Sequence, residues 1–258
     1  MTDFIAVERD NGVQSIRFNR AEKKNAITSA MYGAISAALR DGEASPDVAV
    51  HLILGAPGIF TAGNDIAEFL SIAQGGQFDP GTSGFLQALA TTEKPMVAAV
   101  DGMAVGVGTT LLLHCDIVYA SREAYFKTPF MDLGLFPEAA STLLMPARIG
   151  YGPAFEMLCL GEGFDAERAL RVGLVNAIHP AGELETRARE VALTLAAKPA
   201  DALKVARRMM RREAPQVLAR IDEEIEVLNE RLRSPEAKRA FQAFFDQRAA
   251  APKRAVGE

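Results

Sequence analysis

The chain has 258 residues, and its 28 lysines and arginines against 33 aspartates and glutamates give a formal net charge of −5. This balance disfavours a general nucleic-acid surface, and no apolar run approaches the roughly 20 residues that span a bilayer. The first residues lack the basic-then-apolar layout of a secretory signal, and the final AVGE is no peroxisomal address. We therefore expect a cytoplasmic protein without nucleic-acid or membrane partners.

The cysteines and histidines predict a reduced protein without a metal. Cys115 and Cys159 stand in apolar surroundings and form no C-x-x-C pair, which favours buried free thiols. The three histidines are scattered, so we expect no metal site. His114 lies within the apolar run TTLLLHCDIVY and is expected to pack in the core.

The first 60 residues alternate extended segments with one helix. Residues 4–10 and 13–18 are predicted to form a hairpin, because Asp-Asn-Gly between them suits a tight turn. Residues 28–43 show helical periodicity behind a cap at Thr28 or Ser29. A short apolar run, residues 48–56, predicts a buried strand.

The middle of the chain predicts further strands and helices. Residues 57–70 read as a loop that enters a helix, and the glycine-rich residues 73–84 are expected to be mobile. Residues 94–121 predict a strand, a tight turn, a helix and a second strand. Residues 125–150 predict a strand and a loop, followed by a helix that begins near Pro137.

From about residue 150 onward helices dominate, which predicts an α/β core with an appended helical subdomain. Residues 202–213 gather basic side chains on one helix face, for which a solvated surface is expected and contact with an anionic ligand or partner subunit is the alternative. These are Lys204, Arg207, Arg208, Arg211 and Arg212. Residues 215–234 carry an apolar stripe made of Val217, Leu218, Ile221, Ile225, Leu228 and Leu232.

Two small-residue loops could present backbone amides to a ligand. In FTAGNDI, Ala62 and Gly63 leave the backbone accessible, whereas Asp65 with Glu68 matches a helix capping box and reads as structural. In DGMAVGVGTTLLL, a helix start near Gly106 leaves unpaired N–H groups that suit an anion or a developing oxyanion. A dinucleotide site is disfavoured, because the third glycine of its fingerprint is missing.

Glu138 is the one carboxylate in the apolar and small-residue stretch LGLFPEAAST. An acid after a proline is common in the first turn of a helix, and it can equally be a base in a dry pocket. The two amide-rich loops favour the second interpretation. An apolar setting raises the pKa of a carboxyl group and strengthens it as a base.

Together these segments resemble the enoyl-CoA hydratase/isomerase (crotonase) superfamily. The resemblance rests on the order of IRFNRAEKKNAIT, FTAGNDIAEF, the segment 94–121, GLFPEAASTLLMPARIG, RVGLVNAIHP and AFQAFFDQR. It implies a crotonase-like ββα spiral core over residues 1–195. It also implies a C-terminal helical trimerisation subdomain over residues 196–258, in a homotrimer or a dimer of trimers.

The resemblance assigns roles to single residues. It places the oxyanion hole on the backbone N–H groups of Ala62 and Val107. Hydratases of this family use two glutamates, whose positions are occupied here by Thr110 and Phe130. Glu138 aligns with the single catalytic glutamate of the peroxisomal-type Δ3,Δ2-enoyl-CoA isomerases.

The resemblance therefore implies an enzyme of fatty acid metabolism that moves a double bond from C3 to C2 of an enoyl-CoA, with Glu138 as base and acid. No cofactor is expected, since coenzyme A enters with the substrate. A hydratase or another crotonase-type acyl-CoA enzyme is one alternative, and a non-catalytic CoA-thioester-binding protein is another. Residues expected to bind CoA or substrate are Lys24, Ala26, Gly63, Asn64, Asp65, Ile66, Gly106, Phe130, Leu135 and Phe244.

Overall fold

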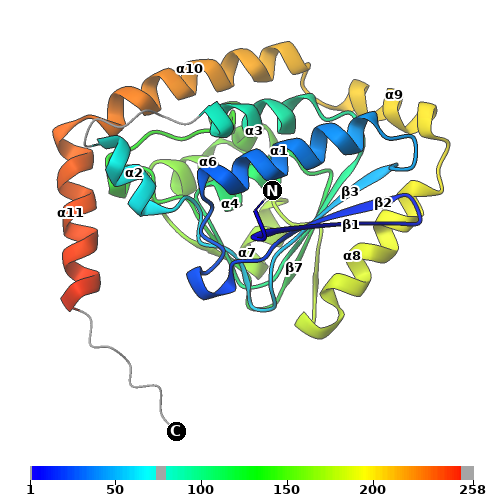
Figure 1. The fold of residues 1–258 in the computed structure, drawn as a ribbon, viewed down its shortest axis with the longest axis horizontal. Coiled ribbons are helices and arrows are strands. Elements are labelled where there is room, and N and C mark those ends of the chain that lie inside the picture. Colours follow the sequence, from blue (N-terminus) through cyan, green and yellow to red (C-terminus); the bar gives the residue numbers. More distant parts are fainter. Residues whose placement is uncertain (1, 74–79, 251–258) are drawn as a thin grey trace, which may run out of the picture.

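Two β-sheets organise the fold in the computed structural model, which describes residues 2–73 and 80–250 (Figure 1). The larger sheet among these residues has six strands, of which β1 and β2 are antiparallel and all other neighbours are parallel. In spatial order they are β1 (Ile5–Asp10), β2 (Val13–Phe18), β3 (Val50–Leu54), β5 (Met96–Val100), β7 (Ile117–Ser121) and β10 (Ala177–His179).

The smaller sheet contains four short strands, of which only the last is antiparallel to its neighbour. They are β4 (Ile59–Thr61), β6 (Met103–Val105), β8 (Tyr125–Lys127) and β9 (Phe164–Asp165). The chain visits the two sheets alternately, since β3 is followed by β4, β5 by β6 and β7 by β8. This repeat confirms the predicted ββα spiral.

Helices cover the sheets and form the C-terminal part of the chain. The α-helices are α1 (Ser29–Ala44), α2 (Ile66–Ala73), α3 (Pro80–Thr91), α4 (Val107–Thr110), α5 (Ser141–Ile149), α6 (Tyr151–Leu158), α7 (Ala166–Val172), α8 (Ala181–Ala196), α9 (Ala200–Met210), α10 (Ala214–Leu232) and α11 (Pro235–Ala250). Three short 3-10 helices are η1 (Ala21–Lys23), η2 (Leu111–His114) and η3 (Met131–Leu133). No helix of the described part is long and apolar enough to cross a membrane.

The predicted local signals at the N-terminal end are confirmed. Asn11 and Gly12 both have positive φ, 49° and 79°, as a tight turn between twisted strands requires. The Thr28 side chain accepts a hydrogen bond from Met31 N and caps α1.

The larger sheet is packed on both faces. On one face, Leu184, Ala188 and Ala192 of α8 bury the valines and leucines of β2, β3 and β5. On the other face lies the main core cluster, which includes side chains of α1, α3, α5 and α10. Strands covered on both faces are typical of parallel sheets, and β3 and β5 are indeed buried at every position.

The C-terminal helices lie against the core. In Figure 1, α10 runs along one side of the molecule above α3, and α11 descends beside α2. The predicted apolar stripe of α10 is confirmed, because Val217, Ile221, Leu228 and Leu232 are buried and the rest of the stripe packs against the core. The division into residues 1–195 and 196–258 stays a prediction.

Two predicted boundaries were wrong. The helix expected near Pro137 begins only at Ser141, because Ala139 and Ala140 have φ values of 62° and 54° and break the helical path. Residues 80–84, expected to be mobile, belong to α3, whereas residues 74–79 lie outside the described residues.

The basic face of α9 is not simply solvated. Arg207 is buried, and its Nε donates to both carboxylate oxygens of Asp116 at 2.9 and 2.8 Å, while Nη1 donates to Thr92 O at 2.6 Å. The ion pair ties α9 to the start of β7. Cys115 is a buried free thiol as predicted, but Cys159 is exposed.

Candidate active site

Two loops from different repeats of the spiral meet at van der Waals distance. Gly63 has φ +85°, and a Cβ on it would lie 2.5 Å from Val105 O. A Cβ on Gly108 would lie 2.5 Å from the Thr61 side chain. Glycine at both positions therefore lets the loop after β4 contact the loop between β6 and α4.

The free amides of these loops define where an oxyanion could bind. Ala62 N already donates to Lys24 O at 2.9 Å, so the prediction that Ala62 supplies one donor is wrong. The next residue but one, Asn64, has a backbone N–H without a partner among the described residues. Val107 begins α4, where N–H groups have no intrahelical acceptor, and its amide likewise has no hydrogen-bond partner in the part of the chain that the structure describes.

The loop of residues 20–27 is fastened to the loop of residues 59–65. The buried Asn25 side chain accepts from Arg20 N and donates to Ile59 O and Phe60 O. Ile27 N donates to Gly63 O at 2.8 Å. This contact places exposed Lys24 and half-buried Ala26 beside the amide-bearing loop, where they were predicted to meet the CoA part of a substrate.

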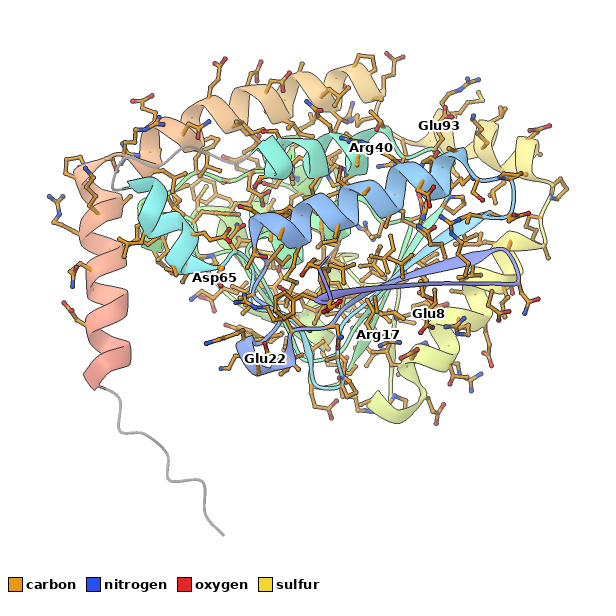
Figure 2. All side chains as sticks on the ribbon, in the orientation of Figure 1. Glu8, Arg17, Glu22, Arg40, Asp65 and Glu93 are labelled. Carbon is orange, nitrogen blue, oxygen red and sulfur yellow. The ribbon has the colours of Figure 1, made fainter. Side chains whose placement is uncertain are left out.

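Asp65 is structural, although the predicted capping box does not form. Its carboxylate accepts from Ala67 N at the start of α2 and pairs with Arg20 at 2.8 Å. The Glu68 carboxylate instead accepts from the amide and hydroxyl of Ser29, both at 2.9 Å. Figure 2 shows Asp65 at the start of α2, next to the loop that carries Glu22. Ile66 follows as the first residue of α2 and packs partly against the core.

Glu138 is 4% exposed, and within the described part of the chain its carboxylate has one side-chain hydrogen bond, from Thr110 Oγ1 to its Oε1 at 2.6 Å. Burial raises the pKa of this carboxyl to about 8, and the Thr110 hydroxyl opposes the rise. The structure thus joins Glu138 with the α4 helix that starts at Val107. A buried carboxyl of this pKa can both take up and deliver a proton near neutral pH.

Tyr32 is a member of the site that the sequence did not reveal. It is buried on α1, and its hydroxyl donates to Asn64 Oδ1 at 2.5 Å. Burial, followed by the charge of Glu138, raises the pKa of the Tyr32 hydroxyl, which keeps it a hydrogen-bond donor. Tyr32 therefore orients the side chain of the residue whose backbone amide is free.

The remaining predicted binding residues lie in three places. Phe130 and Leu135 are buried in the core cluster, and Leu135 N donates to Phe130 O at 2.8 Å. Gly106 is the N-cap of α4, and its own N–H donates to Lys127 O. Phe244 lies in α11, but its side chain is outside the described part. Its neighbour Phe241, a second candidate for covering the ligand, is fully buried in the core.

A second buried carboxylate was also not foreseen. Glu224 of α10 is 1% exposed and accepts hydrogen bonds from the amide and hydroxyl of Thr142, at 3.0 and 2.6 Å. Burial raises the pKa of its carboxyl to about 7. The charge of Glu224 in turn contributes to the raised pKa of Glu138, so the two carboxyls are near one another.

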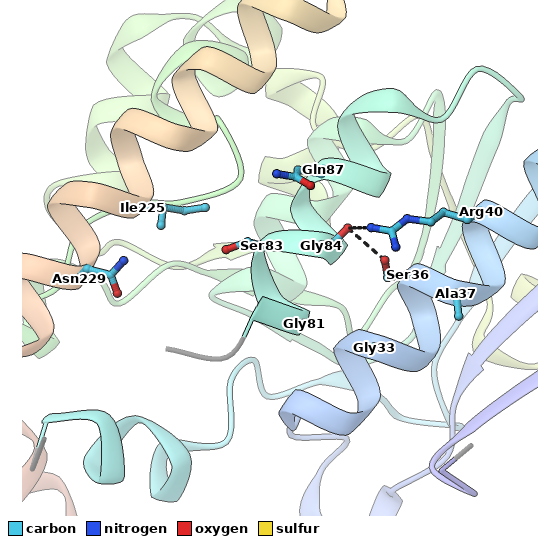
Figure 3. Close-up of a pocket in the computed structure, with 10 residues that line it drawn as sticks. All are labelled: Gly33, Ser36, Ala37, Arg40, Gly81, Ser83, Gly84, Gln87, Ile225 and Asn229. Carbon is cyan, nitrogen blue, oxygen red and sulfur yellow. Dashed lines mark hydrogen bonds between the residues drawn. The ribbon is translucent and has the colours of Figure 1, made fainter. Parts of the chain in front are cut away.

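A cavity of about 760 Å³ lies elsewhere, between α1, α3 and α10 (Figure 3). Small residues line it together with Arg40, and both Ser36 and Arg40 donate to Gly84 O. Glu138 does not line this cavity. Among the described residues, no three His, Cys, Asp or Glu side chains cluster in a way that could hold a metal ion.

Comparison with known proteins agrees with the fold. The profile of the enoyl-CoA hydratase/isomerase family matches residues 8–253. The chain is 35% identical over 247 residues to Enoyl-CoA delta isomerase 2 of Rattus norvegicus, covering 93% of this chain and 63% of that protein. It is 33% identical to the probable enoyl-CoA hydratase echA8 of Mycobacterium leprae, covering 84% of each. The chain thus spans less than two thirds of the rat protein.

Solved structures give the same result. The structure of Pseudomonas aeruginosa OdaA is similar with a TM-score of 0.89 and 41% identity, covering 94% of this chain and 99% of that one. An enoyl-CoA hydratase/isomerase from Pseudoalteromonas atlantica has a TM-score of 0.90 and 35% identity, covering 95% and 98%. The fold and site define a crotonase-type protein. The chain belongs to the enoyl-CoA hydratase/isomerase family.

Proposed function

We propose that the protein is a Δ3,Δ2-enoyl-CoA isomerase in which Glu138 is the catalytic base and acid. The observation that carries the proposal is the pairing of Glu138 with Thr110. In the hydratases that the sequence resembles, a glutamate would occupy position 110, and another would occupy position 130. Here a hydroxyl and the buried Phe130 side chain take those places, which leaves one carboxylate for the chemistry.

One carboxylate is sufficient for moving a double bond. The Glu138 carboxylate takes the C2 proton of a 3-enoyl-CoA, and the electron pair of that C–H bond forms a dienolate on the thioester. The same carboxyl then delivers the proton to C4, which yields the 2-enoyl-CoA without gain or loss of atoms. The amides of Asn64 and Val107 would donate to the thioester oxygen, at about 3 kcal/mol of transition-state stabilisation for each donor.

The CoA part of the substrate would lie along the fastened loops. We assign Lys24 and Ala26 to its nucleotide side, and Gly63, Asn64, Asp65, Ile66 and Gly106 to its pantetheine side. Phe130 and Leu135 would border the acyl group, and Phe244 would cover the ligand. No cofactor is needed, because the proton is returned and no electrons leave the substrate. We also assign the enzyme to fatty acid β-oxidation and to the cytoplasm, in keeping with its free thiols.

We further propose a homotrimer or a dimer of trimers assembled through the C-terminal helices. α9 exposes Met209 and Met210, which are 80% and 81% accessible, together with Val205. Large apolar side chains gathered on one helix are typical of an interface. Light scattering would give a trimeric or hexameric mass for the wild type and a smaller mass for Met209→Glu/Met210→Glu. A wild-type monomer would contradict this assignment.

The function is tested with purified protein and two substrates. With a 3-enoyl-CoA, we expect the conjugated 2-enoyl thioester to form, and its ultraviolet absorbance measures the rate. Glu138→Gln should lower kcat by about 10²-fold or more while the ligand still binds. Glu226→Gln, an exposed glutamate of α10, is the matched control. Hydration of a 2-trans-enoyl-CoA that survives Glu138→Gln would contradict the isomerase, and binding without turnover would favour a non-catalytic thioester-binding protein.

A further inference from the structure

The turn directly after Glu138 is strained. Ala139 and Ala140 both adopt the left-handed conformation, with φ values of 62° and 54°. This conformation is unfavourable for any L-residue that has a Cβ atom. Two such residues in succession therefore persist only where surrounding contacts hold them. The backbone conformation that places Glu138 therefore depends on contacts from elsewhere in the chain.

Two side chains from distant elements hold this turn. His114 of η2 lies with Nε2 at 2.9 Å from Ala139 O, and burial lowers the pKa of its imidazole to about 4, so the neutral ring donates through Nε2. Glu224 of α10 accepts from the amide and the hydroxyl of Thr142, two residues after Ala140. The two left-handed residues are thus held through the carbonyl of Ala139 and through the residue that follows them by two positions.

Burying the Glu224 carboxyl group costs free energy. It lies on the buried face of α10 between Ile221 and Leu228, and its Oε2 has no hydrogen-bond partner among the described residues. If Glu224 served only to fill space, a leucine at this position would give a more stable protein. Among the described residues, its side-chain hydrogen bonds go to Thr142, four residues after Glu138.

We propose that Glu224 is a positioning residue that fixes the Ala139–Thr142 turn and thereby aims the Glu138 carboxyl at the substrate. The proposal rests on the proposed isomerase for its kinetic consequence only. It makes the C-terminal helix α10 a part of the active-site architecture, since removing one α10 side chain would release a turn that belongs to the spiral core.

The charged and titratable groups around the pair come from four elements. Tyr32 of α1 and Glu224 of α10 interact electrostatically with Glu138, and Thr110 of α4 donates to it. Arg220 of α10 lowers the pKa of Glu224, and His114 of η2 contacts the turn between them. Of these groups, Glu224 is the one that raises the pKa of Glu138 through its negative charge.

Two substitutions separate the geometric effect from the effect of charge. Glu224→Ala removes the acceptor and should lower kcat by about 10- to 100-fold with KM changed less than about threefold, because the base is misplaced and the CoA contacts remain. Glu224→Gln keeps an oxygen that can accept from Thr142, so kcat should stay within about threefold. It also removes the charge, so the acid limb of kcat/KM should move to lower pH. The control Glu226→Gln should change neither.

A measurement without substrate keeps the two proposals apart. Hydrogen–deuterium exchange of the Thr142 amide should accelerate in Glu224→Ala and stay near the wild-type rate in Glu226→Gln. Unchanged exchange, or a wild-type kcat in folded Glu224→Ala, would overturn the positioning role. If Glu224→Ala does not fold, Thr142→Val takes its place, because it removes the hydroxyl from which Glu224 accepts, and a wild-type kcat with unchanged exchange in that variant would overturn the role. A wild type that turns over no 3-enoyl-CoA but shows the exchange effect would overturn the isomerase and leave the positioning of Glu138 intact.

Discussion

Thr110 and Glu138 lie 28 residues apart in the chain and meet in the core, where the threonine hydroxyl donates to Glu138 Oε1 at 2.6 Å. The bond fixes one carboxylate oxygen and leaves Oε2 for the substrate. It also favours the ionised form of Glu138, against the effect of burial. A threonine therefore tunes the carboxyl group that we propose as the base, at the position where hydratases would carry a second carboxylate.

Thr110→Val, which keeps the shape but removes the hydroxyl, should weaken this base. The pKa of Glu138 rises when its hydrogen bond is lost, so the acid limb of kcat/KM moves to higher pH. We expect kcat/KM at pH 7 to fall by about tenfold, since a hydrogen bond to a charged group contributes about 1.5–3 kcal/mol. Thr109→Val is the control, because the Thr109 hydroxyl donates to Ala104 O instead. Equal pH profiles for the two variants would contradict the tuning role.

The pH dependence of the wild type follows from burial of the base. The Glu138 carboxyl has a pKa of about 8 and must be ionised to accept the C2 proton. Hence kcat/KM should rise with pH and level off above about 8, as steady-state rates across pH 5 to 9 would reveal. An acid limb near the ordinary carboxyl pKa of about 4.3 would contradict a buried base.

The same burial makes stability fall as pH rises. Glu138 has a folded pKa of about 8 against an ordinary glutamate pKa of about 4.3, so the folded state binds more protons between these values. The contribution of protonated Glu138 to the unfolding free energy is therefore fully present below about pH 4.3 and is lost as the pH rises toward 8. Glu138→Gln removes this contribution and should exceed the wild type in unfolding free energy by about 2–4 kcal/mol at pH 8. Urea unfolding at pH 5 and pH 8 measures the difference, which should be small at pH 5.

Local sequence signals predicted much of the fold, because they act over a few residues. The Asn11–Gly12 turn, the Thr28 cap and the apolar stripe of α10 all lie where the pattern placed them. The ββα spiral followed from the resemblance, whereas the hydrogen bond between Thr110 and Glu138 was not predicted. Neither could come from periodicity alone, since both depend on contacts between distant segments.

What the sequence missed involves long-range contacts that override local pattern. Tyr32 stands at core spacing on α1, so its hydroxyl gave no signal of a role. Glu224 occupies a buried position of α10, but it follows Asp222 and Glu223, and a run of acidic residues predicts a solvent-exposed helix face. The amide of Ala62 was excluded by a bond to Lys24 O, which only the folded chain reveals.

The tie between α9 and the core depends on Arg207. Arg207→Ala leaves the Asp116 carboxylate without its cation and should lower the unfolding free energy by about 3 kcal/mol. Arg208→Ala, at an exposed position of the same helix, should change it by less than about 0.5 kcal/mol. Chemical denaturation of the two variants tests this. Equal small losses of unfolding free energy would contradict the tie and would indicate that the basic face of α9 is simply solvated.

The contact between the two amide-bearing loops depends on the absence of a side chain at Gly63. In Gly63→Ala, the new Cβ would lie 2.5 Å from Val105 O, at a φ of +85° that an alanine adopts only with strain. The loop before α4 must then move, and with it the free Val107 amide. We expect a loss of about 3 kcal/mol in unfolding free energy and a fall in kcat. Gly58→Ala is the matched control, because Gly58 has φ +74° with nothing within 4 Å, and its strain alone should cost about 1 kcal/mol. If Gly63→Ala proved no worse than Gly58→Ala, the two loops would not be packed closely enough to present their amides to one oxygen.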